Sequence, residues 1–210
     1  MKKIGIFTLN GYYNYGNRLQ NYAAQEVLKS LGFDVETVLV DLTNNSTKPT
    51  LTTRINNFTF KKLYKKLKKK IVPKNLINER EKIFKEFTKE YIRETDYKLD
   101  HNDIPDGFQS KYDYFVTGSD QVWNPKNINE SSIFFLTFAP KEKRIAYSPS
   151  FGTQDIPVEY VERYKNWLLE IEAISVREQA GAKIIKELTG RDATVLLDPT
   201  MMLSKEEWLS

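Results

Sequence analysis

Polar side chains follow a short apolar run near the middle of the chain. The run spans Tyr114–Thr117, and the sequence after it reads GSDQVWN. A carboxylate in such a place, here Asp120, can accept a hydrogen bond from a substrate hydroxyl or act as a general base. The alternative is structural, because Ser119 or Asp120 can cap a turn and Trp123 can pack on the edge of a sheet. The residue types alone leave both interpretations open.

A second group of candidate residues lies in the loop near the amino terminus. Gly11 and Gly16 have the spacing of a phosphate-binding P-loop, but Asn17 and Arg18 stand where Lys and Ser or Thr would hold phosphate and magnesium. ATP binding by that mechanism is therefore not expected. A helix amino terminus preceded by glycine still offers backbone N–H groups to an anion or a sugar hydroxyl. Asn14, Gly16 and Asn17 are candidate ligand contacts, with turn formation and helix capping as the alternative.

Arg177 is the third candidate, because it ends the apolar run AISV. Its guanidinium can bind a carboxylate or a phosphate with two parallel hydrogen bonds, which suits an anionic small molecule. The alternative is a local ion pair with Glu178 or Asp198, which contributes little to stability when it is exposed. Asp198 precedes Pro199, and we interpret it as a turn former.

These candidates need a fold that brings distant segments together, and the hydrophobic pattern predicts one. Strands are predicted at residues 3–7, 34–42, 114–117, 144–150, 173–178 and 194–200, and helices at about residues 17–31, 79–91, 158–171 and 179–190, with a helix start at 204–210. This alternation indicates an α/β fold of the Rossmann type, a parallel sheet with helices on both faces. Ligands of such sheets bind beyond the carboxyl ends of the strands. Asn17, Asp120 and Arg177 are therefore expected to converge at one rim of the sheet.

The net charge of +4 is unevenly distributed. Residues 54–98 hold 15 basic and 6 acidic residues, whereas the rest of the chain holds 17 and 22. Within residues 60–72, Leu63, Leu67 and Ile71 stand four apart among lysines, which predicts a solvated basic helix with a narrow apolar stripe. Peripheral contact with an anionic membrane is the alternative. Nucleic acid ranks third, because no recognition motif accompanies the charge.

The rest of the composition excludes several classes of protein. The chain has no cysteine, so a disulfide framework, a thiolate nucleophile and a cysteine-ligated zinc site are excluded. His101 is the single histidine; we interpret it as an exposed loop residue and predict no metal site. No run approaches the roughly 20 apolar residues of a membrane span, and the amino-terminal run is too short for a signal peptide. We expect a cytoplasmic protein, with peripheral contact at the inner membrane face as the alternative.

Five segments in order carry a resemblance to a known family. They are NYGNRLQNYAAQEVLKSLG, YDYFVTGSDQVWNP, KRIAYSPSFG, ISVREQAGAKIIKELTG and VLLDPTMML. Together they resemble the amino-terminal half of the polysaccharide pyruvyl transferase family, and GSDQVWN combined with SVRE is the most specific part. The resemblance covers nearly the whole chain except a basic helical insertion at about residues 45–110. It implies that residues 1–210 form the amino-terminal Rossmann-like domain of a two-domain enzyme similar to GT-B glycosyltransferases, with the second domain absent from this chain.

The resemblance also implies a reaction and a set of site residues. The reaction transfers a pyruvyl group from phosphoenolpyruvate to a sugar of a capsular, exopolysaccharide or cell-wall glycan, or of its lipid-linked precursor, and forms a ketal without a cofactor. Arg177 matches the arginine proposed to hold the donor, and Asp120 is the second catalytic candidate. The residues that match the family's cleft-lining loops are Asn14, Gly16, Asn17, Ser119, Asp120 and Gln121.

One departure from the family bears on activity. Family members carry an Arg-Leu-His type motif in a second α/β domain, which supplies the general acid, and these 210 residues do not contain it. Phosphoenolpyruvate becomes electrophilic when its methylene carbon is protonated, so an acid is needed. His101 cannot be assumed to replace it. The resemblance thus predicts a chain that is inactive alone.

Two other functions fit the same architecture. One is a GT-B type glycosyltransferase that uses a sugar nucleotide, and the other is a glycan-binding domain without catalysis. Turnover of phosphoenolpyruvate by the full-length protein separates the pyruvyl transferase from both, because fold likeness supports function only weakly without the site itself.

Overall fold

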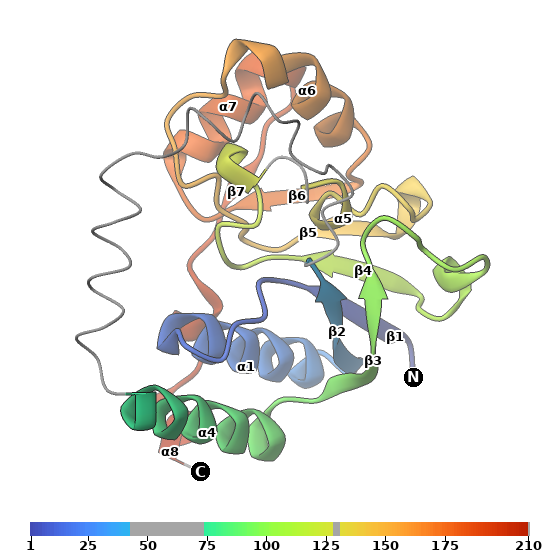
Figure 1. The fold of residues 1–210 in the computed structure, drawn as a ribbon. Coiled ribbons are helices and arrows are strands. Elements are labelled where there is room, and N and C mark those ends of the chain that lie inside the picture. The colour runs from blue at the N-terminus through green and yellow to red at the C-terminus, as the bar shows by residue number, and fades with distance from the viewer. Residues whose placement is uncertain (43–73, 128–130, 210) are drawn as a thin grey trace, which may run out of the picture.

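The computed structural model describes residues 1–42, 74–127 and 131–209. These residues form a parallel sheet of seven strands in the order β3-β2-β1-β4-β5-β6-β7 (Figure 1). The strands are β1 Lys3–Phe7, β2 Asp34–Asp41, β3 Glu94–Asp100, β4 Tyr114–Thr117, β5 Arg144–Ala146, β6 Ala173–Val176 and β7 Thr194–Val195. This sheet, with helices around it, confirms the predicted α/β class of the Rossmann type.

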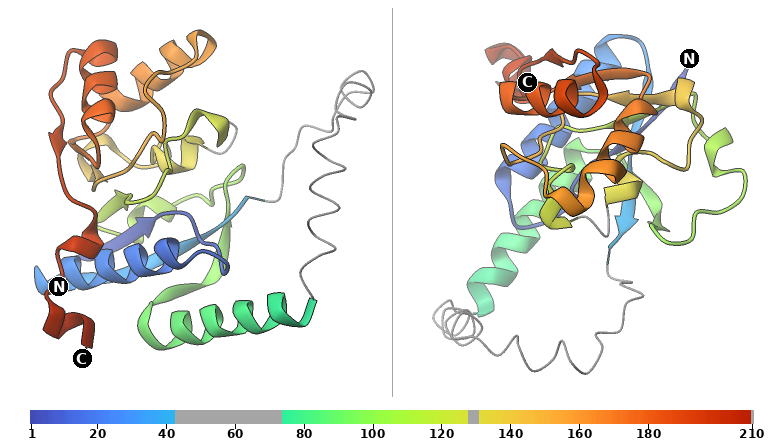
Figure 2. Two further views of the ribbon diagram at one scale, coloured as in Figure 1. Left: turned by 90° about the vertical axis from the view of Figure 1, so that its left-hand side faces the viewer. Right: turned by 90° about the horizontal axis from the view of Figure 1, so that it is seen from above.

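Helices join consecutive strands, as the alternating pattern predicts. The α-helices are α1 Tyr15–Ser30, α4 Lys74–Tyr91, α5 Ser131–Phe134, α6 Val161–Leu169, α7 Gln179–Thr189 and α8 Lys205–Leu209. The 3-10 helices are η1 Phe108–Ser110, η2 Pro125–Asn127, η3 Lys141–Lys143, η4 Val158–Tyr160 and η5 Pro199–Met201. Figures 1 and 2 show α1 beside α4, and α6 beside α7 in another part of the molecule.

The two faces of the sheet have separate cores, because side chains alternate along each strand. Ile6 and Val116 pack with Ala24 of α1 on one face. Phe7 and Phe115 belong to a larger core on the other face, which includes buried side chains of α6 and α7. Helices therefore cover both faces, as the sequence predicts.

The order in which successive strands are added to the sheet reverses between β1 and β4. From β1 it proceeds outward to β2 and β3, then returns to the centre at β4 and proceeds outward again to β7. Phe7 and Thr117 are register partners at the carboxyl ends of β1 and β4. The loops that begin at Thr8 and Gly118 therefore leave the sheet side by side, at the switch point where open α/β sheets bind ligands.

The segment at about residues 45–110 contains a strand that the sequence analysis missed. α4 confirms a helix in this segment, but β3 adds a further strand at the edge of the sheet. Its sequence ETDYKLD buries Thr95 and Leu99, while Asp96 and Lys98 between them are exposed. This is the alternation of an edge strand, and its charges hid the pattern. Residues 60–72 lie outside the described residues, so the basic helix there stays a prediction.

His101 corrects another expectation. We expected an exposed loop histidine, but only 8% of the residue is accessible, and its Nδ1 lies 2.8 Å from the carbonyl oxygen of Asp41. The turn after β3 places this ring against the end of β2. In the part of the chain that the structure describes, no helix has the length and apolar character needed to cross a membrane.

Candidate functional site

A pocket of about 180 Å³ lies at the carboxyl edge of the sheet. It is formed by the start of α1 and by the segments that follow β4, β6 and β7. Its lining residues are Asn14, Gly16, Asn17, Gln20, Asp120, Arg177, Asp198 and Thr200. The expected convergence of Asn17, Asp120 and Arg177 is therefore present.

Asn17 and Asp120 are in direct contact, although they are far apart in the sequence. The Nδ2 of Asn17 donates a hydrogen bond of 2.8 Å to Oδ2 of Asp120. The Oδ1 of Asn17 accepts hydrogen bonds from the Gly11 amide at 3.1 Å and from Nη2 of Arg18 at 3.0 Å. Because this oxygen faces two donors, the amide has one satisfactory orientation, with its NH₂ group toward Asp120.

Asp120 keeps unused capacity to accept hydrogen bonds. Its Oδ2 accepts from Asn17, and its Oδ1 accepts from the Gln121 amide at 2.7 Å. A carboxylate has about four acceptor positions, so hydrogen-bond capacity remains on the side that lines the pocket. A half-buried carboxylate held in this way can accept a hydrogen bond, or a proton, from a substrate hydroxyl.

Gly118 directs the chain from β4 to Asp120. Its φ is 134°, and a Cβ added there would lie 1.9 Å from the carbonyl oxygen of Tyr147. Residues with a side chain fit neither this backbone conformation nor this space. Gly118 therefore allows the chain to turn so that the polar segment after Thr117 reaches the pocket.

Arg177 closes the opposite side of the pocket. Its Nη1 donates to the backbone oxygen of Ser119 at 2.8 Å and to Oδ2 of Asp198 at 2.9 Å, and its Nε lies 3.9 Å from Glu178. The ion pair with Asp198, which the sequence analysis gave as the alternative, thus exists. Its Nη2 makes no hydrogen bond to any residue that the structure describes, and 29% of the side chain is exposed. One edge of the guanidinium remains for an anionic ligand.

Asp198 forms the turn that the sequence predicts, and it also lines the pocket. Its Oδ1 accepts from the amide and the hydroxyl of Thr200, at 3.0 and 2.8 Å, while its Oδ2 faces Arg177. The sequence analysis favoured the turn and did not count Asp198 among the site residues. The available signal was its position, because Asp198 lies beyond β7 at the same edge of the sheet where Asp120 lies beyond β4.

Gln20 is a further lining residue that the sequence analysis missed. It is 3% exposed; its Nε2 donates to the Thr8 hydroxyl at 3.0 Å and to the Asn17 carbonyl at 3.1 Å, and its Oε1 accepts from the Ser119 amide at 3.0 Å. One side chain therefore ties the loops after β1 and β4 to α1. Its spacing of three from Asn17 places both on one helix face, which was the available signal.

Ser119 and Gln121 do not line the pocket. Ser119 is fully buried, and its backbone N–H and carbonyl bind Gln20 and Arg177. Gln121 is exposed, and its Oε1 accepts from Nδ2 of Asn124 at 3.2 Å. Ser119 thus supports the site through its backbone and through its hydroxyl, which donates to Oδ2 of Asp198 at 3.5 Å. Ligand contacts by the side chains of Ser119 and Gln121 stay a prediction.

The start of α1 contributes positive potential to the pocket. Asn14 occupies the N-cap position, but its side chain makes no capping hydrogen bond, and the first turn contains no acidic residue. Free N–H groups and the helix dipole favour negative charge here. Of the alternatives for Asn14, side-chain capping is therefore not what the structure shows. The positive groups, α1 and Arg177, face two carboxylates, Asp120 and Asp198.

A family profile described as Polysaccharide pyruvyl transferase matches residues 14–210. The chain belongs to the polysaccharide pyruvyl transferase family. The matched region of this pyruvyl transferase family member begins at Asn14 and contains every residue that lines the pocket. Comparisons with curated proteins and with solved structures find no match.

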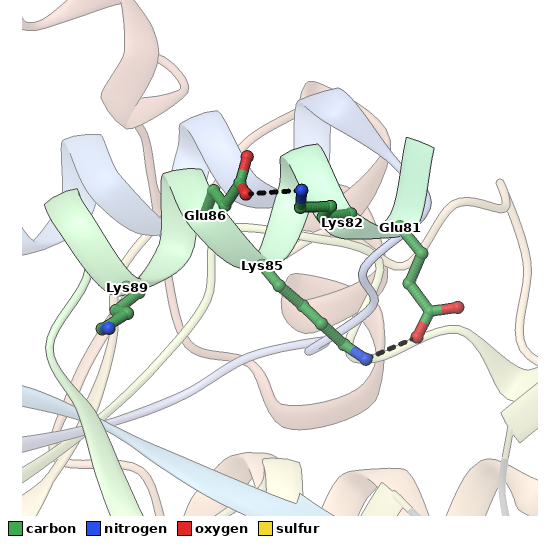
Figure 3. Close-up of a pocket in the computed structure, with 5 residues that line it drawn as sticks. All are labelled: Glu81, Lys82, Lys85, Glu86 and Lys89. Carbon is green, nitrogen blue, oxygen red and sulfur yellow. Dashed lines mark ion pairs between the residues drawn. The ribbon is translucent and has the colours of Figure 1, made fainter. Parts of the chain in front are cut away.

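A larger hollow, of about 430 Å³, lies along α4 of this family member (Figure 3). Its lining residues are Glu81, Lys82, Lys85, Glu86 and Lys89. They come from one helix, and Glu81 and Glu86 pair with Lys85 and Lys82 at 2.8 and 3.6 Å. These exposed pairs are ordinary features of a solvated helix face. The pocket at the sheet edge is therefore the stronger candidate site.

Among the described residues, no group of three or more His, Asp or Glu side chains is placed to hold a metal ion. Asp120 and Asp198 are instead occupied by amide, hydroxyl and guanidinium donors.

Proposed function

We propose that this chain contributes the rim of a site that transfers a pyruvyl group from phosphoenolpyruvate to a sugar of a surface glycan. Family membership indicates polysaccharide pyruvyl transferase activity in general terms. The donor, the ketal product and the capsular, exopolysaccharide or cell-wall acceptor are the specific parts of the proposal. The observation that carries it is the meeting of a carboxylate, Asp120, and a partly free guanidinium, Arg177, in one pocket inside the matched region.

Each of these groups has a defined task in the proposed reaction. Protonation of the methylene carbon of phosphoenolpyruvate makes the neighbouring carbon electrophilic, and a sugar hydroxyl then attacks that carbon. Asp120 accepts the proton of the attacking hydroxyl. Arg177 holds the donor's carboxylate or phosphate through Nη2, which is the edge of the guanidinium that faces no described partner. A second hydroxyl of the sugar then attacks the same carbon, the bond from that carbon to the phosphate oxygen breaks, and the departing inorganic phosphate takes the proton of this hydroxyl.

The charges of the pocket add a requirement. Phosphoenolpyruvate carries two anionic groups, whereas the lining residues offer one arginine against two carboxylates. Further cations and the general acid must therefore come from outside these lining residues. We place them in a second domain, in a GT-B-like arrangement. The side-chain amides of Asn14 and Asn17 and the hydroxyl of Thr200 suit the hydroxyls of a sugar.

The direct test measures phosphate release and product mass. Full-length protein is incubated with phosphoenolpyruvate and a panel of free saccharides and p-nitrophenyl glycosides. We expect phosphate release that depends on the saccharide, together with a product that has gained one pyruvyl ketal. Transfer from a sugar nucleotide would identify a glycosyltransferase instead, and saccharide binding without turnover of any donor would identify a binding domain.

The membrane alternative for residues 60–72 also belongs to this proposal, since a lipid-linked acceptor would lie at the inner membrane face. The basic composition of this segment supports it. We expect the full chain to sediment with vesicles that contain phosphatidylserine, and to remain in solution with vesicles of phosphatidylcholine alone. Equal sedimentation with both vesicles, or with neither, would contradict an electrostatic contact.

A further inference from the structure

A buried ion pair lies directly behind the pocket. Arg18 of α1 is 1% exposed, and its Nη1 donates to Oε1 of Glu94 at 2.8 Å. Glu94 opens β3, at the far edge of the sheet, and its side chain is 11% exposed. Burying two charges has a large desolvation cost, and a well-packed apolar pair would commonly stabilise a fold as well. The location of this pair therefore invites an explanation beyond stability.

The partners of this pair hold its geometry tightly. The hydroxyl of Tyr12 donates to Oε2 of Glu94 at 2.9 Å, so both carboxylate oxygens are engaged. The Arg18 guanidinium lies 5.5 Å from the centre of the Tyr12 ring. Burial and the charge of Glu94 raise the pKa of Tyr12 to about 12, so the hydroxyl stays a donor at neutral pH. The guanidinium plane is fixed on one side by Glu94 and on its face by Tyr12.

The other end of the guanidinium leads to the pocket. Its Nη2 reaches the Leu9 carbonyl at 3.4 Å, Oδ1 of Asn10 at 3.1 Å and Oδ1 of Asn17 at 3.0 Å. Of these three acceptors, Asn17 is the one that lines the pocket and binds Asp120. A continuous series of hydrogen bonds thus joins Glu94 on the edge strand to Asp120 at the site.

We propose that Arg18, held by Glu94, is a positioning residue that fixes the Asn17 amide and through it the Asp120 carboxylate. An asparagine amide can rotate and exchange its oxygen and nitrogen. Rotation of Asn17 would bring its NH₂ group against two donors, Nη2 of Arg18 and the Gly11 amide, while its oxygen would face the oxygens of Asp120. Arg18 therefore keeps the donating side of Asn17 on Asp120.

Lysine cannot perform this task. The planar fork of arginine presents Nη1 to Glu94 and Nη2 to Asn17 simultaneously, whereas a lysine ammonium is a single point of charge on a flexible stem. Arg18→Lys therefore keeps the charge beside Glu94 and loses the bridge. This variant separates positioning from charge, and it remains usable if the apolar variant Arg18→Met does not fold.

The first test is spectroscopic and does not depend on the reaction. In the full chain labelled with ¹⁵N, the side-chain NH₂ signal of Asn17 is assigned by its loss in Asn17→Asp. We expect Arg18→Lys and Arg18→Met to shift this signal and to speed its exchange with water, because the amide is no longer held. An Asn17 signal identical to wild type in a folded Arg18→Lys variant would overturn the proposal.

Arg191 provides a matched control for the loss of a structural arginine. Its Nη1 donates to the carbonyls of Leu168 and Ile171 at 2.9 and 2.7 Å, and it is not among the residues that line the pocket. Arg191→Met should lower the free energy of unfolding and leave the Asn17 signal in place. If Arg191→Met moves the Asn17 signal as much as Arg18→Lys does, the effect is general loosening of the fold and the proposal is wrong.

The second test is kinetic, and it alone rests on the proposed function. A double-mutant cycle compares Arg18→Lys, Asn17→Ala and the double variant in phosphate release from phosphoenolpyruvate. We expect Arg18→Lys to lower kcat about tenfold, and to have less than about a twofold further effect when Asn17 is already alanine. Independent, multiplicative effects would show that Arg18 does not act through Asn17. If no variant, including wild type, turns over phosphoenolpyruvate, the proposed function fails while the NMR result still decides the positioning role.

Discussion

At the scale of single residues, the two carboxylates of the pocket differ in the number of hydrogen-bond donors that surround them. Asp198 faces four donor groups, which are the amide and hydroxyl of Thr200, Nη1 of Arg177 and, at 3.5 Å, the hydroxyl of Ser119. Among the described residues, Asp120 faces two donors, which are Nδ2 of Asn17 and the amide of Gln121. A carboxylate has about four acceptor positions, so Asp198 is saturated and Asp120 is not. Asp198 therefore acts as an anchor for Arg177, and Asp120 is the residue free to meet a substrate.

This difference predicts separable effects of two matched substitutions. Asp120→Asn should lower kcat for pyruvyl transfer by about 10²- to 10⁴-fold, the usual contribution of a general base, with little change in stability. Asp198→Asn should mainly raise the KM for phosphoenolpyruvate, because Arg177 loses its anchor. Steady-state kinetics and urea unfolding of both variants measure the two effects. Equal losses of kcat in both variants would contradict this division of roles.

Gly118 allows a test of how strictly the pocket depends on its backbone. Gly118→Ala places a Cβ against the Tyr147 carbonyl in a backbone conformation that suits glycine, so we expect a loss of more than about 2 kcal/mol of unfolding free energy. Gly107→Ala is the matched control, since Gly107 has φ 76° but no atom within 4 Å of the added Cβ. It should lose only about 1 kcal/mol. Similar losses in urea unfolding would show that the close approach at Gly118 is relieved cheaply.

At the scale of secondary-structure elements, Glu36 connects β2 to neighbouring segments of the chain through ion pairs and a hydrogen bond. It accepts from Nζ of Lys3 on β1 at 2.8 Å and from the hydroxyl of Tyr112 at 2.7 Å, and the Nε of Arg93 lies 3.6 Å away. Burial alone would raise the pKa of Glu36, but the hydrogen bonds from Lys3 and Tyr112, with the charges of Lys3 and Arg93, hold it below its ordinary value. The folded state therefore favours the carboxylate form.

The sign of this shift fixes a pH dependence. Because the pKa of Glu36 is lower in the folded state, its contribution is fully present above the unfolded pKa, near 4.5, and is lost as the pH falls through the folded pKa. We expect Glu36→Gln to lower the unfolding free energy by about 1 to 2 kcal/mol at neutral pH. The difference from wild type should shrink below pH 4.5. Urea unfolding between pH 3 and 7 measures it, with Glu86→Gln, on the exposed face of α4, as a control expected to change little.

The elements that the sequence predicts well are those with a strong local pattern. β1 and β4 have the predicted bounds, because each is a short run of apolar residues ended by glycine or polar residues. β3 was missed because an edge strand carries charges on its open side. β5 and β6 end earlier than predicted, at Ala146 and Val176, because amides that follow them leave the strand ladder: the Ser148 amide donates to the side chain of Ser175, and the Arg177 amide donates to the Pro149 carbonyl.

The sequence predicted which residues converge at the pocket, but it did not predict the contacts that buried residues make with each other. Asn17, Asp120 and Arg177 follow strands, and strand ends of a parallel sheet share an edge. The buried roles of Gln20 and Arg18 depend on partners about 100 and 76 residues away in sequence, namely Ser119 and Glu94. Local pattern carries no information on such pairings, so these contacts required the structure.

At the scale of the whole molecule, one face of the sheet is only partly covered. A groove of about 660 Å³ crosses β4, β5 and β6 on the side of α1. Most of its lining is apolar, including Leu31 at the end of α1, Phe33, Ile145 and Leu196. Leu31 is 66% exposed. An exposed apolar surface of this kind binds amphiphilic probes.

This groove gives a prediction for the native chain. The dye 1-anilinonaphthalene-8-sulfonate should fluoresce with the folded protein in the absence of denaturant. Leu31→Lys should reduce the signal, because it puts a charge at the rim of the groove. Val158→Lys replaces a more exposed apolar residue, 89% accessible, outside the groove and should leave the signal unchanged. Equal fluorescence of the two variants would place the dye elsewhere.

The return of the chain from β3 to β4 divides the molecule into two consecutive halves that meet along one seam. β1 and β4 form this seam through four register pairs, from Ile4 with Tyr114 to Phe7 with Thr117. The pocket straddles it, since Asn17 belongs to the first half and Asp120 and Arg177 belong to the second. Severing the backbone within residues 101–113 would therefore leave two pieces that each hold an incomplete set of ligand contacts. The pocket would form again only when the two pieces associate, and not when either piece folds alone. A ligand that binds the pocket would therefore stabilise their association.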